Sequence, residues 1–74
     1  MNEYYISSSG EKKKISEMNT EYILNAMGKK MREIFNSTTY EEYTQMLNEI
    51  NALKEEYYKR LNQFVEKIGE KNGE

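Results

Sequence analysis

The sequence predicts a mainly α fold, in which two helices of unequal length form an antiparallel hairpin after a short N-terminal segment. Three observations predict this fold. None of the 74 residues is proline, so no position is barred from a helix interior for that reason. Apolar residues recur every three or four positions along two segments, which is the spacing of an amphipathic helix. A polar run at residues 36–39 separates the segments, and so short a connection makes the helices antiparallel neighbours.

Residues 1–18 precede the first helix and have two interpretations. The runs at 3–6 and 12–15 flank a turn-forming Ser-Ser-Ser-Gly-Glu stretch, a pattern typical of a short β-hairpin. Three consecutive lysines are poor strand formers, however, and an isolated hairpin is only marginally stable in water. A loosely ordered arm therefore remains the alternative.

The first helix is predicted over residues 19–36, with Asn19 as its N-cap. Met18 and Ile23 then occupy the two positions that pack together in a hydrophobic staple. Gly28 lies inside the helix, where it allows a close helix approach or is simply tolerated at about 1 kcal/mol relative to alanine; we expect tolerance. The apolar stripe comprises Ile23, Met27, Met31 and Ile34, with Leu24 and Phe35 beside it.

The second helix is predicted over residues 39–69 and carries the strongest periodic signal in the chain. Its apolar seam alternates steps of four and three residues, as in a coiled coil. The seam comprises Tyr43, Leu47, Ile50, Lys54, Tyr57, Leu61, Phe64 and Ile68. A lysine at position 54 sets the register or oligomeric state, extends its ammonium group to the rim, or faces a ligand. We expect one of the first two roles.

Ordinary capping signals mark both ends of this second helix. Thr38 with Glu41, or Thr39 with Glu42, has the spacing of a capping box. Gly69 is a natural helix stop, after which the tail is expected to fray.

Antiparallel packing determines which side chains should meet. Near the connection, Ile34 and Phe35 are expected to lie close to Tyr43 and Leu47. Further along, Ile23 is expected to face Leu53 and Tyr57.

The first helix is too short to cover the second, because they span about 24 Å and about 43 Å. The apolar residues left over are Leu61, Phe64, Val65 and Ile68. Together with Ile50 and Tyr57 they form the predicted interface of a homo-oligomer, most simply a dimer. Residues 1–69 are thus expected to form one small domain, followed by a frayed tail at 70–74.

The composition supports a core shared between chains. The hydrophobic fraction is 36%, against a usual ~45–50% in globular domains. In a chain this short, one core rarely supplies more than ~3–5 kcal/mol without a disulfide, a metal or oligomerisation. Because the chain has no Cys and no His, oligomerisation is the supplement that we expect.

The same absences argue against catalysis and metal binding. Glu42, Glu49 and Glu56 repeat at seven-residue spacing, but the histidine half of a di-metal motif is missing, so a solvated acidic face is expected. Serines near the lysine run 12–14 would need an oxyanion hole and a dry pocket, which so small a chain is not expected to build. We therefore expect no enzymatic activity, metal or cofactor.

Charge and hydropathy limit which partners and which cellular location the protein is expected to have. Eleven basic and 13 acidic residues give a net charge of −2, which disfavours nucleic acid as a partner. No apolar run approaches the ~20 residues that span a membrane, and the N-terminus lacks the pattern of a secretory signal. The expected location is the bacterial cytoplasm.

Two kinds of partner remain. A host protein would suit the aromatic end of the second helix, because Tyr, Phe, Met and Arg are enriched at interface hot spots. A small nucleotide, bound at a subunit boundary, would use basic side chains for its phosphates and a tyrosine for its base. The candidate contacts are Lys12, Lys13, Lys14, Lys54, Tyr58 and Arg60. Surface lysines that maintain solubility and tyrosines that fill the core are the competing explanation.

The run from Ile15 to Ala26, Ile-Ser-Glu-Met-Asn-Thr-Glu-Tyr-Ile-Leu-Asn-Ala, resembles the opening of small accessory proteins of bacteriophages and prophages. Those proteins have a short hairpin, an Ile-x-x-Met element and a helix with an Asn-Ala pair. The resemblance covers about a third of the chain and assigns no functional residue. It implies a stoichiometric inhibitor of a host defence protein, or a sponge for a nucleotide signal, in an infected cell.

Overall fold

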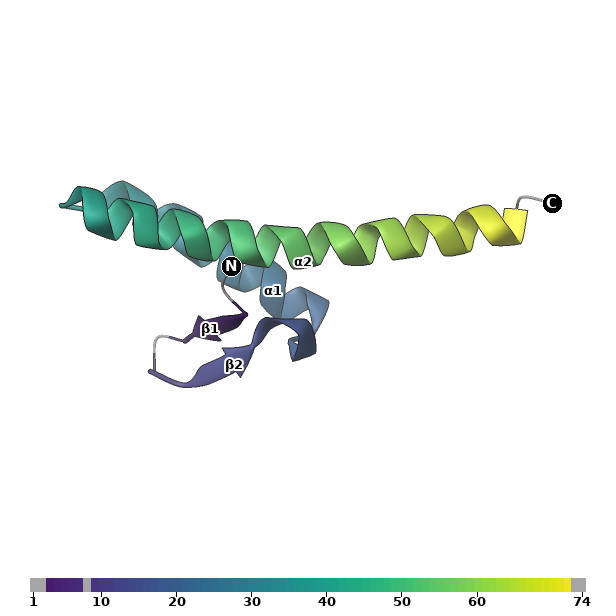
Figure 1. Cartoon of the computed structure of the whole chain (residues 1–74), viewed down its shortest axis with the longest axis horizontal. Coiled ribbons are helices and arrows are strands. Elements are labelled where there is room, and N and C mark those ends of the chain that lie inside the picture. Colours follow the sequence, from purple (N-terminus) through teal and green to yellow (C-terminus); the bar gives the residue numbers. More distant parts are fainter. Residues whose placement is uncertain (1–2, 8, 73–74) are drawn as a thin grey trace.

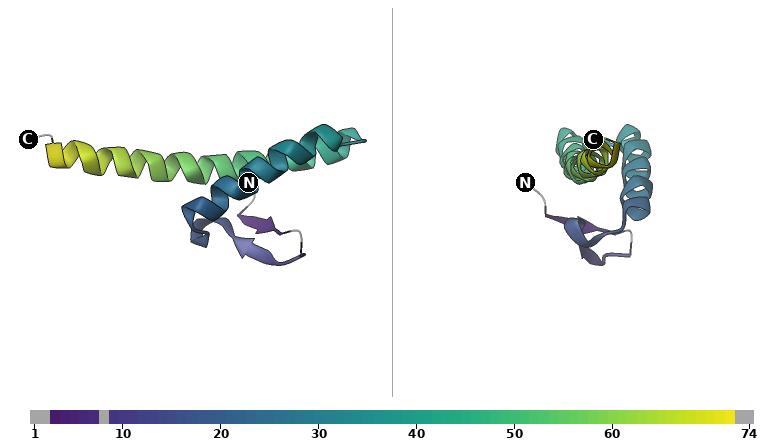
Figure 2. Two further views of the ribbon diagram at one scale, coloured as in Figure 1. Left: turned by 180° about the vertical axis from the view of Figure 1, so that it is seen from behind. Right: turned by 90° about the vertical axis from the view of Figure 1, so that its right-hand side faces the viewer.

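The computed structural model describes residues 3–7 and 9–72 and confirms the mainly α hairpin. In chain order the elements are β1 (Tyr4–Ile6), β2 (Lys12–Lys14), the 3-10 turn η1 (Ile15–Glu17), α1 (Thr20–Glu33), the 3-10 turn η2 (Ile34–Asn36) and α2 (Tyr40–Asn72). The molecule is a rod of 53 × 22 × 20 Å, because α2 extends far beyond the other elements (Figure 1). From behind, α1 crosses only the N-terminal part of α2, and the β-hairpin lies below both helices (Figure 2).

The N-terminal segment is a β-hairpin, so the first of its two interpretations is confirmed. β1 and β2 pair antiparallel, with Tyr5 opposite Lys13 at the centre. The connecting turn closes through a 2.9 Å bond from the Gly10 N–H to the Ser7 carbonyl, and Gly10 has a φ of 89°, which favours glycine. The hairpin does not stand alone in water, because its Tyr5 side chain is buried in the core.

The start of α1 follows its sequence signals. The Asn19 carboxamide accepts a hydrogen bond of 2.7 Å from the Tyr22 N–H. Met18 and Ile23 are both buried in one cluster, as the predicted staple requires. A Cβ added at Gly28 would meet Arg32 Nη1 at 3.5 Å, an ordinary contact, so this glycine is tolerated rather than required by close packing.

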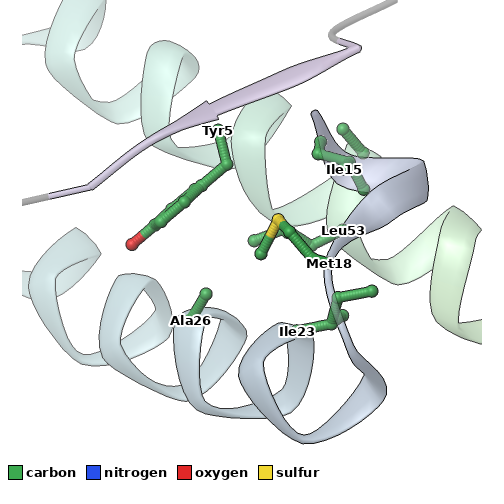
Figure 3. Close-up of a cluster of buried hydrophobic side chains, with 7 residues drawn as sticks. Tyr5, Ile15, Met18, Ile23, Ala26 and Leu53 are labelled. Atoms are coloured by element: carbon green, nitrogen blue, oxygen red, sulfur yellow. The ribbon is translucent and has the colours of Figure 1, made fainter. Parts of the chain in front are cut away.

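The core lies where the hairpin, α1 and the middle of α2 meet (Figure 3). Leu53 from α2 and Ile23 from α1 are its two fully buried large side chains. The cluster comprises Tyr5, Ile15, Met18, Ile23, Ala26, Ala52 and Leu53. The Tyr5 ring also meets the Tyr22 ring edge-on, with 6.3 Å between centroids.

The buried side of α2 is rotated from the predicted seam. Leu53 lies at its centre, whereas Tyr43 and Leu47 on the seam are exposed. The expected contact of Phe35 with these two residues is wrong, because Phe35 is 87% exposed. Side chains of α1 and the hairpin approach α2 from the side of Leu53, which leaves part of the seam uncovered.

The C-terminal end of α2 also differs from expectation. The helix passes through Gly69, where a stop was predicted, and continues to Asn72. A helical glycine costs about 1 kcal/mol but, unlike proline, keeps its N–H donor, so it does not have to end a helix. Residues 73–74 of the predicted tail lie outside the described residues.

Candidate functional site

The most prominent surface is on the part of α2 that extends beyond the core, on the right in Figure 1. Its apolar side chains are each between 39% and 60% exposed. They are Tyr58, Leu61, Phe64, Val65 and Ile68, and we call them the overhang face. At 100° per residue these positions fall within an arc of about 120° on one side of the helix. Such a stripe is the usual mark of a helix that packs against something.

The predicted interface is therefore divided by the structure. Leu61, Phe64, Val65 and Ile68 are exposed together on the overhang face. Ile50 is only 8% exposed and has little surface to offer a partner. Tyr57 is half-buried and packs against the core cluster. These two predicted interface residues contribute to the interior of the protomer, because α1 and the hairpin cover that part of α2.

A second apolar surface lies at the connection between the helices. Phe35 is 87% and Tyr40 is 79% exposed, and the Tyr40 and Tyr43 rings are 6.4 Å apart. With Met31, also exposed, these residues form what we call the tip face. The candidate residues chosen from the sequence did not include it. In the sequence, this surface could have been inferred from the two aromatic residues, Phe35 and Tyr40, on either side of the short polar connection.

The lysine run 12–14 lies on β2, at an open hollow of about 400 Å³. The hollow is also lined by Glu17, Met18, Asn19 and Tyr22. The Lys13 ammonium lies 5.0 Å from the Tyr22 ring centroid and 3.7 Å from a Glu11 carboxylate oxygen. This hollow therefore combines basic groups with one aromatic ring.

Arg60, predicted as a phosphate contact, instead joins α2 to the segment between β2 and α1. Its guanidinium donates to Thr20 Oγ1 at 3.0 Å and to the Ser16 carbonyl at 3.3 Å. Glu56 accepts from its Nε at 2.8 Å. Because these groups occupy the guanidinium, Arg60 is a structural strut rather than a free anion contact.

The other two predicted nucleotide contacts on α2 lie apart from the lysine hollow. Lys54 is exposed on α2, as a rim position requires, and Tyr58 belongs to the overhang face. Neither side chain lines the hollow at β2. The structure thus keeps the three lysines of β2 together but does not bring the six candidates into one site.

The expected solvated acidic face holds for Glu42, which is exposed, but is wrong for Glu49 and Glu56, which are partly buried ion-pair partners. Glu42 accepts from the Thr38 N–H at 2.9 Å near the start of α2. Glu49 forms an ion pair of 3.0 Å with Lys30 of α1, and Glu56 holds Arg60. Each carboxylate is committed to a neighbouring group because the cations and N–H donors are brought within reach by the fold.

Two side chains in these interactions, Glu42 and Lys30, have shifted pKa values. Hydrogen bonds from the Thr38 N–H and hydroxyl lower the pKa of Glu42. Burial acts to lower the pKa of Lys30, but the hydrogen bond and charge of Glu49 outweigh it and leave this pKa raised. Both shifts favour the charged form, which suits structural ion pairing rather than proton transfer.

Among residues 3–7 and 9–72, no three His, Cys, Asp or Glu side chains are placed to hold a metal ion. No helix in the described part of the chain is long and apolar enough to cross a membrane. Comparisons with protein-family models, curated proteins and solved structures give no match.

Proposed function

We propose that the protein is a non-enzymatic inhibitor of the kind that bacteriophages direct against host defence. In this proposal it works in the bacterial cytoplasm as a homo-oligomer and binds one host protein stoichiometrically. The observation that carries the proposal is the presence of two separate apolar faces at opposite ends of the rod. One face can serve self-association while the other remains free for a different protein.

We assign the host protein to the tip face. Phe35 and Tyr40 are large aromatic side chains that contribute almost nothing to the protomer core. Exposing them costs solubility, and aromatic side chains on a protein surface are the usual anchors of an interface. The tip face therefore supports binding of a folded partner with a pocket for an aromatic ring.

The test uses bacteria that each carry a single defence system and a bacteriophage that the system restricts. Expression of the chain should restore plaque formation against at least one system. The double variant Phe35→Ala/Tyr40→Ala should lose this effect, whereas Tyr4→Ala, which truncates an exposed aromatic on the hairpin, should keep it. If no system responds to the native chain, the defence-inhibitor proposal is wrong.

Direct binding should then be measured between the purified chain and the defence protein identified in this way. Truncation of two interface anchors should weaken binding at least about tenfold. Equal affinity of the native chain and the tip variant would remove the tip face as the binding site.

A second function, sequestration of a small nucleotide messenger, is favoured by the lysine hollow at β2. The three lysines would contact phosphates and the Tyr22 ring would contact a base. A thermal-shift screen with cyclic nucleotides and ADP-ribose derivatives should raise the melting temperature if the chain is such a sponge. The variant Lys12→Gln/Lys13→Gln should abolish the shift and Lys67→Gln should not. A flat screen with the native chain would exclude this alternative.

A further inference from the structure

We propose that the overhang face binds the overhang face of a second copy, with the two helices antiparallel. The inference rests on the homo-oligomeric part of the proposed function and deepens it by naming the surface, direction and register. The five residues of the face recur at steps of three and four from Tyr58 to Ile68, which is the pattern of a helix-pairing seam. No charged residue lies among them.

The area of the face supports a second copy as its occupant. Two such faces, each with five large side chains that are 39–60% exposed, would remove on the order of 1,000 Å² from water, near the lower limit for a specific interface. A dimer of moderate strength is therefore expected, because area of this size must also offset the loss of rotational and translational freedom.

Among the antiparallel registers, one lets all five residues of the face take part. Leu61 of each copy faces Val65 of the other, and Tyr58 faces Ile68, so that every layer is apolar. Phe64 lies beside the twofold axis. A slip of one heptad would place Lys54 against Val65 in two layers. Because burying an unpaired ammonium is costly, this slip is disfavoured.

The same lysine disfavours a parallel pair. In a parallel dimer each residue of the seam faces its own counterpart, which puts the two Lys54 ammonium groups opposite each other. Antiparallel pairing of the overhangs leaves Lys54 outside the interface and places the bulk of each protomer at opposite ends. The two tip faces then point away from each other, and the dimer can bind two partner molecules.

Sedimentation equilibrium of the full chain tests the association. The native chain should dimerise in the micromolar range. Leu61→Glu should be monomeric, with a dissociation constant raised at least about 100-fold, because a carboxylate enters both of the layers that pair Leu61 with Val65 on either side of the twofold axis. The matched control is Gln63→Glu, which adds the same charge on the opposite side of the same overhang and should behave as native. Circular dichroism should show equal helix content in all three proteins. A native chain that stays monomeric up to hundreds of micromolar would overturn the proposal, as would a dimer that persists in Leu61→Glu.

Cysteine crosslinking tests the direction, since the chain has no native cysteine. In the antiparallel dimer, the two copies of residue 62 are offset by two residues, about 3 Å along the axis, so Asn62→Cys should be joined by a short bis-maleimide. The two copies of residue 68 are offset by ten residues, about 15 Å, so Ile68→Cys should not form a disulfide, which needs Cα atoms within ~7 Å. An Ile68→Cys disulfide without Asn62→Cys crosslinking would indicate a parallel pair and overturn the proposed direction.

Failure of this inference can be separated from failure of the proposed function. Leu61→Glu leaves the tip face intact, and Phe35→Ala/Tyr40→Ala leaves the overhang face intact. If dimerisation fails while plaque formation is restored, the inhibitor works without the overhang pair. If dimerisation succeeds while no defence system responds, the dimer stands and the inhibitor function does not.

Discussion

Arg60 shows at the scale of one residue how a side chain can join distant parts of a short chain. It lies on α2 but donates to the Thr20 hydroxyl and to the Ser16 carbonyl, 40 and 44 positions earlier in the sequence. Glu56, one turn before it, orients the guanidinium. The helical spacing of Glu56 and Arg60 can be read from the sequence, but the approach of the Thr20 and Ser16 oxygens cannot.

Replacing Arg60 by Ala should therefore loosen the N-terminal segment from α2. Loss of hydrogen bonds to a charged group should lower the free energy of unfolding by about 1–3 kcal/mol, as measured by urea denaturation. Lys54→Ala on the same helix is the control and should change it by less than about 0.5 kcal/mol, because Lys54 is an exposed position. Similar stability of the two variants would mean that the strut has no energetic role.

Lys30 joins the two helices through Glu49, with its ammonium also 5.7 Å from the Tyr5 ring centroid. The pKa of Lys30 is raised, as described above, and the pKa of Tyr5 is raised by burial. Both groups favour their protonated form in the folded state. Their contribution to stability is therefore complete below their unfolded values near pH 10 and is lost as the pH rises through the folded values.

The variant Lys30→Met should measure the lysine part of this effect. At neutral pH it should be less stable than the native chain by about 0.5–1 kcal/mol, the upper range for a partly exposed ion pair. The difference should shrink above pH 10.5, where the lysine of the native chain begins to lose its proton. Chemical denaturation between pH 7 and 11.5 gives the comparison, and Lys67→Met on the overhang should show no such convergence.

At the scale of elements, the helix starts are the best predicted features. Asn19 caps α1, and the Thr39 hydroxyl accepts from the Glu42 N–H at 3.0 Å at the start of α2. The Glu42 carboxylate reaches back to Thr38, one residue earlier than a standard capping box. Of the two capping boxes proposed from the sequence, the pair Thr39 and Glu42 is thus the one whose N-cap forms. Local bonds of this kind depend on a few neighbouring residues, which is why the sequence indicates them.

The cap of α2 should make part of the stability sensitive to acid. The pKa of Glu42 is lowered from 4.5 by the Thr38 donors, so its contribution is present above pH 4.5 and disappears as the pH falls through the folded value. Glu42→Gln should therefore show a smaller fall in melting temperature than the native chain between pH 6 and pH 2.5, as measured by thermal melts. Glu41→Gln, which changes the neighbouring glutamate, should show the same fall in melting temperature as the native chain.

The β-hairpin and the C-terminal end of α2 are elements that local signals did not decide. A lysine-rich strand is unfavourable on its own, yet β2 forms because Tyr5 of β1 enters the core and Ile15 follows directly after β2 into the same cluster. Glycine is common where helices end, but no contact around Gly69 among the described residues requires the chain to turn, and α2 continues through it. Both outcomes depend on what surrounds the segment rather than on its residues.

At the scale of the whole molecule, the rod consists of a packed body and an extended helix end (Figures 1 and 2). The body consists of the β-hairpin with η1, α1 and the middle of α2, and all of these supply side chains to one small core. The overhang face lies beyond this core. Stability of the protomer should therefore be concentrated in the body. Association should depend on the overhang.

A matched pair of aromatic truncations tests this division. Tyr5→Ala removes a ring from the core and should destabilise the protomer by about 3–5 kcal/mol, enough to unfold much of so small a protein. Phe64→Ala removes a ring from the overhang and should change stability by less than about 1 kcal/mol at concentrations below dimerisation. Urea titrations of both variants at low protein concentration provide the measurement. A large loss in Phe64→Ala under these conditions would show that the overhang belongs to the folding unit.

The sequence by itself determined the helical class, the N-cap of the first helix, two candidate N-caps for the second, the staple of Met18 and Ile23, and the excess length of the second helix. These features follow from local hydrogen bonds and from periodicity, which depend on residues close together in the chain. Only the tertiary structure decided which side of α2 is buried, that Ile50 and Tyr57 belong to the interior, and that Arg60 is a strut. It also decided that Phe35 is exposed at the tip. The apolar stripe of α2 is too wide for one packing partner to cover, so its sequence does not specify which side becomes buried. That side is the one with Leu53, because α1 and the β-hairpin pack there together.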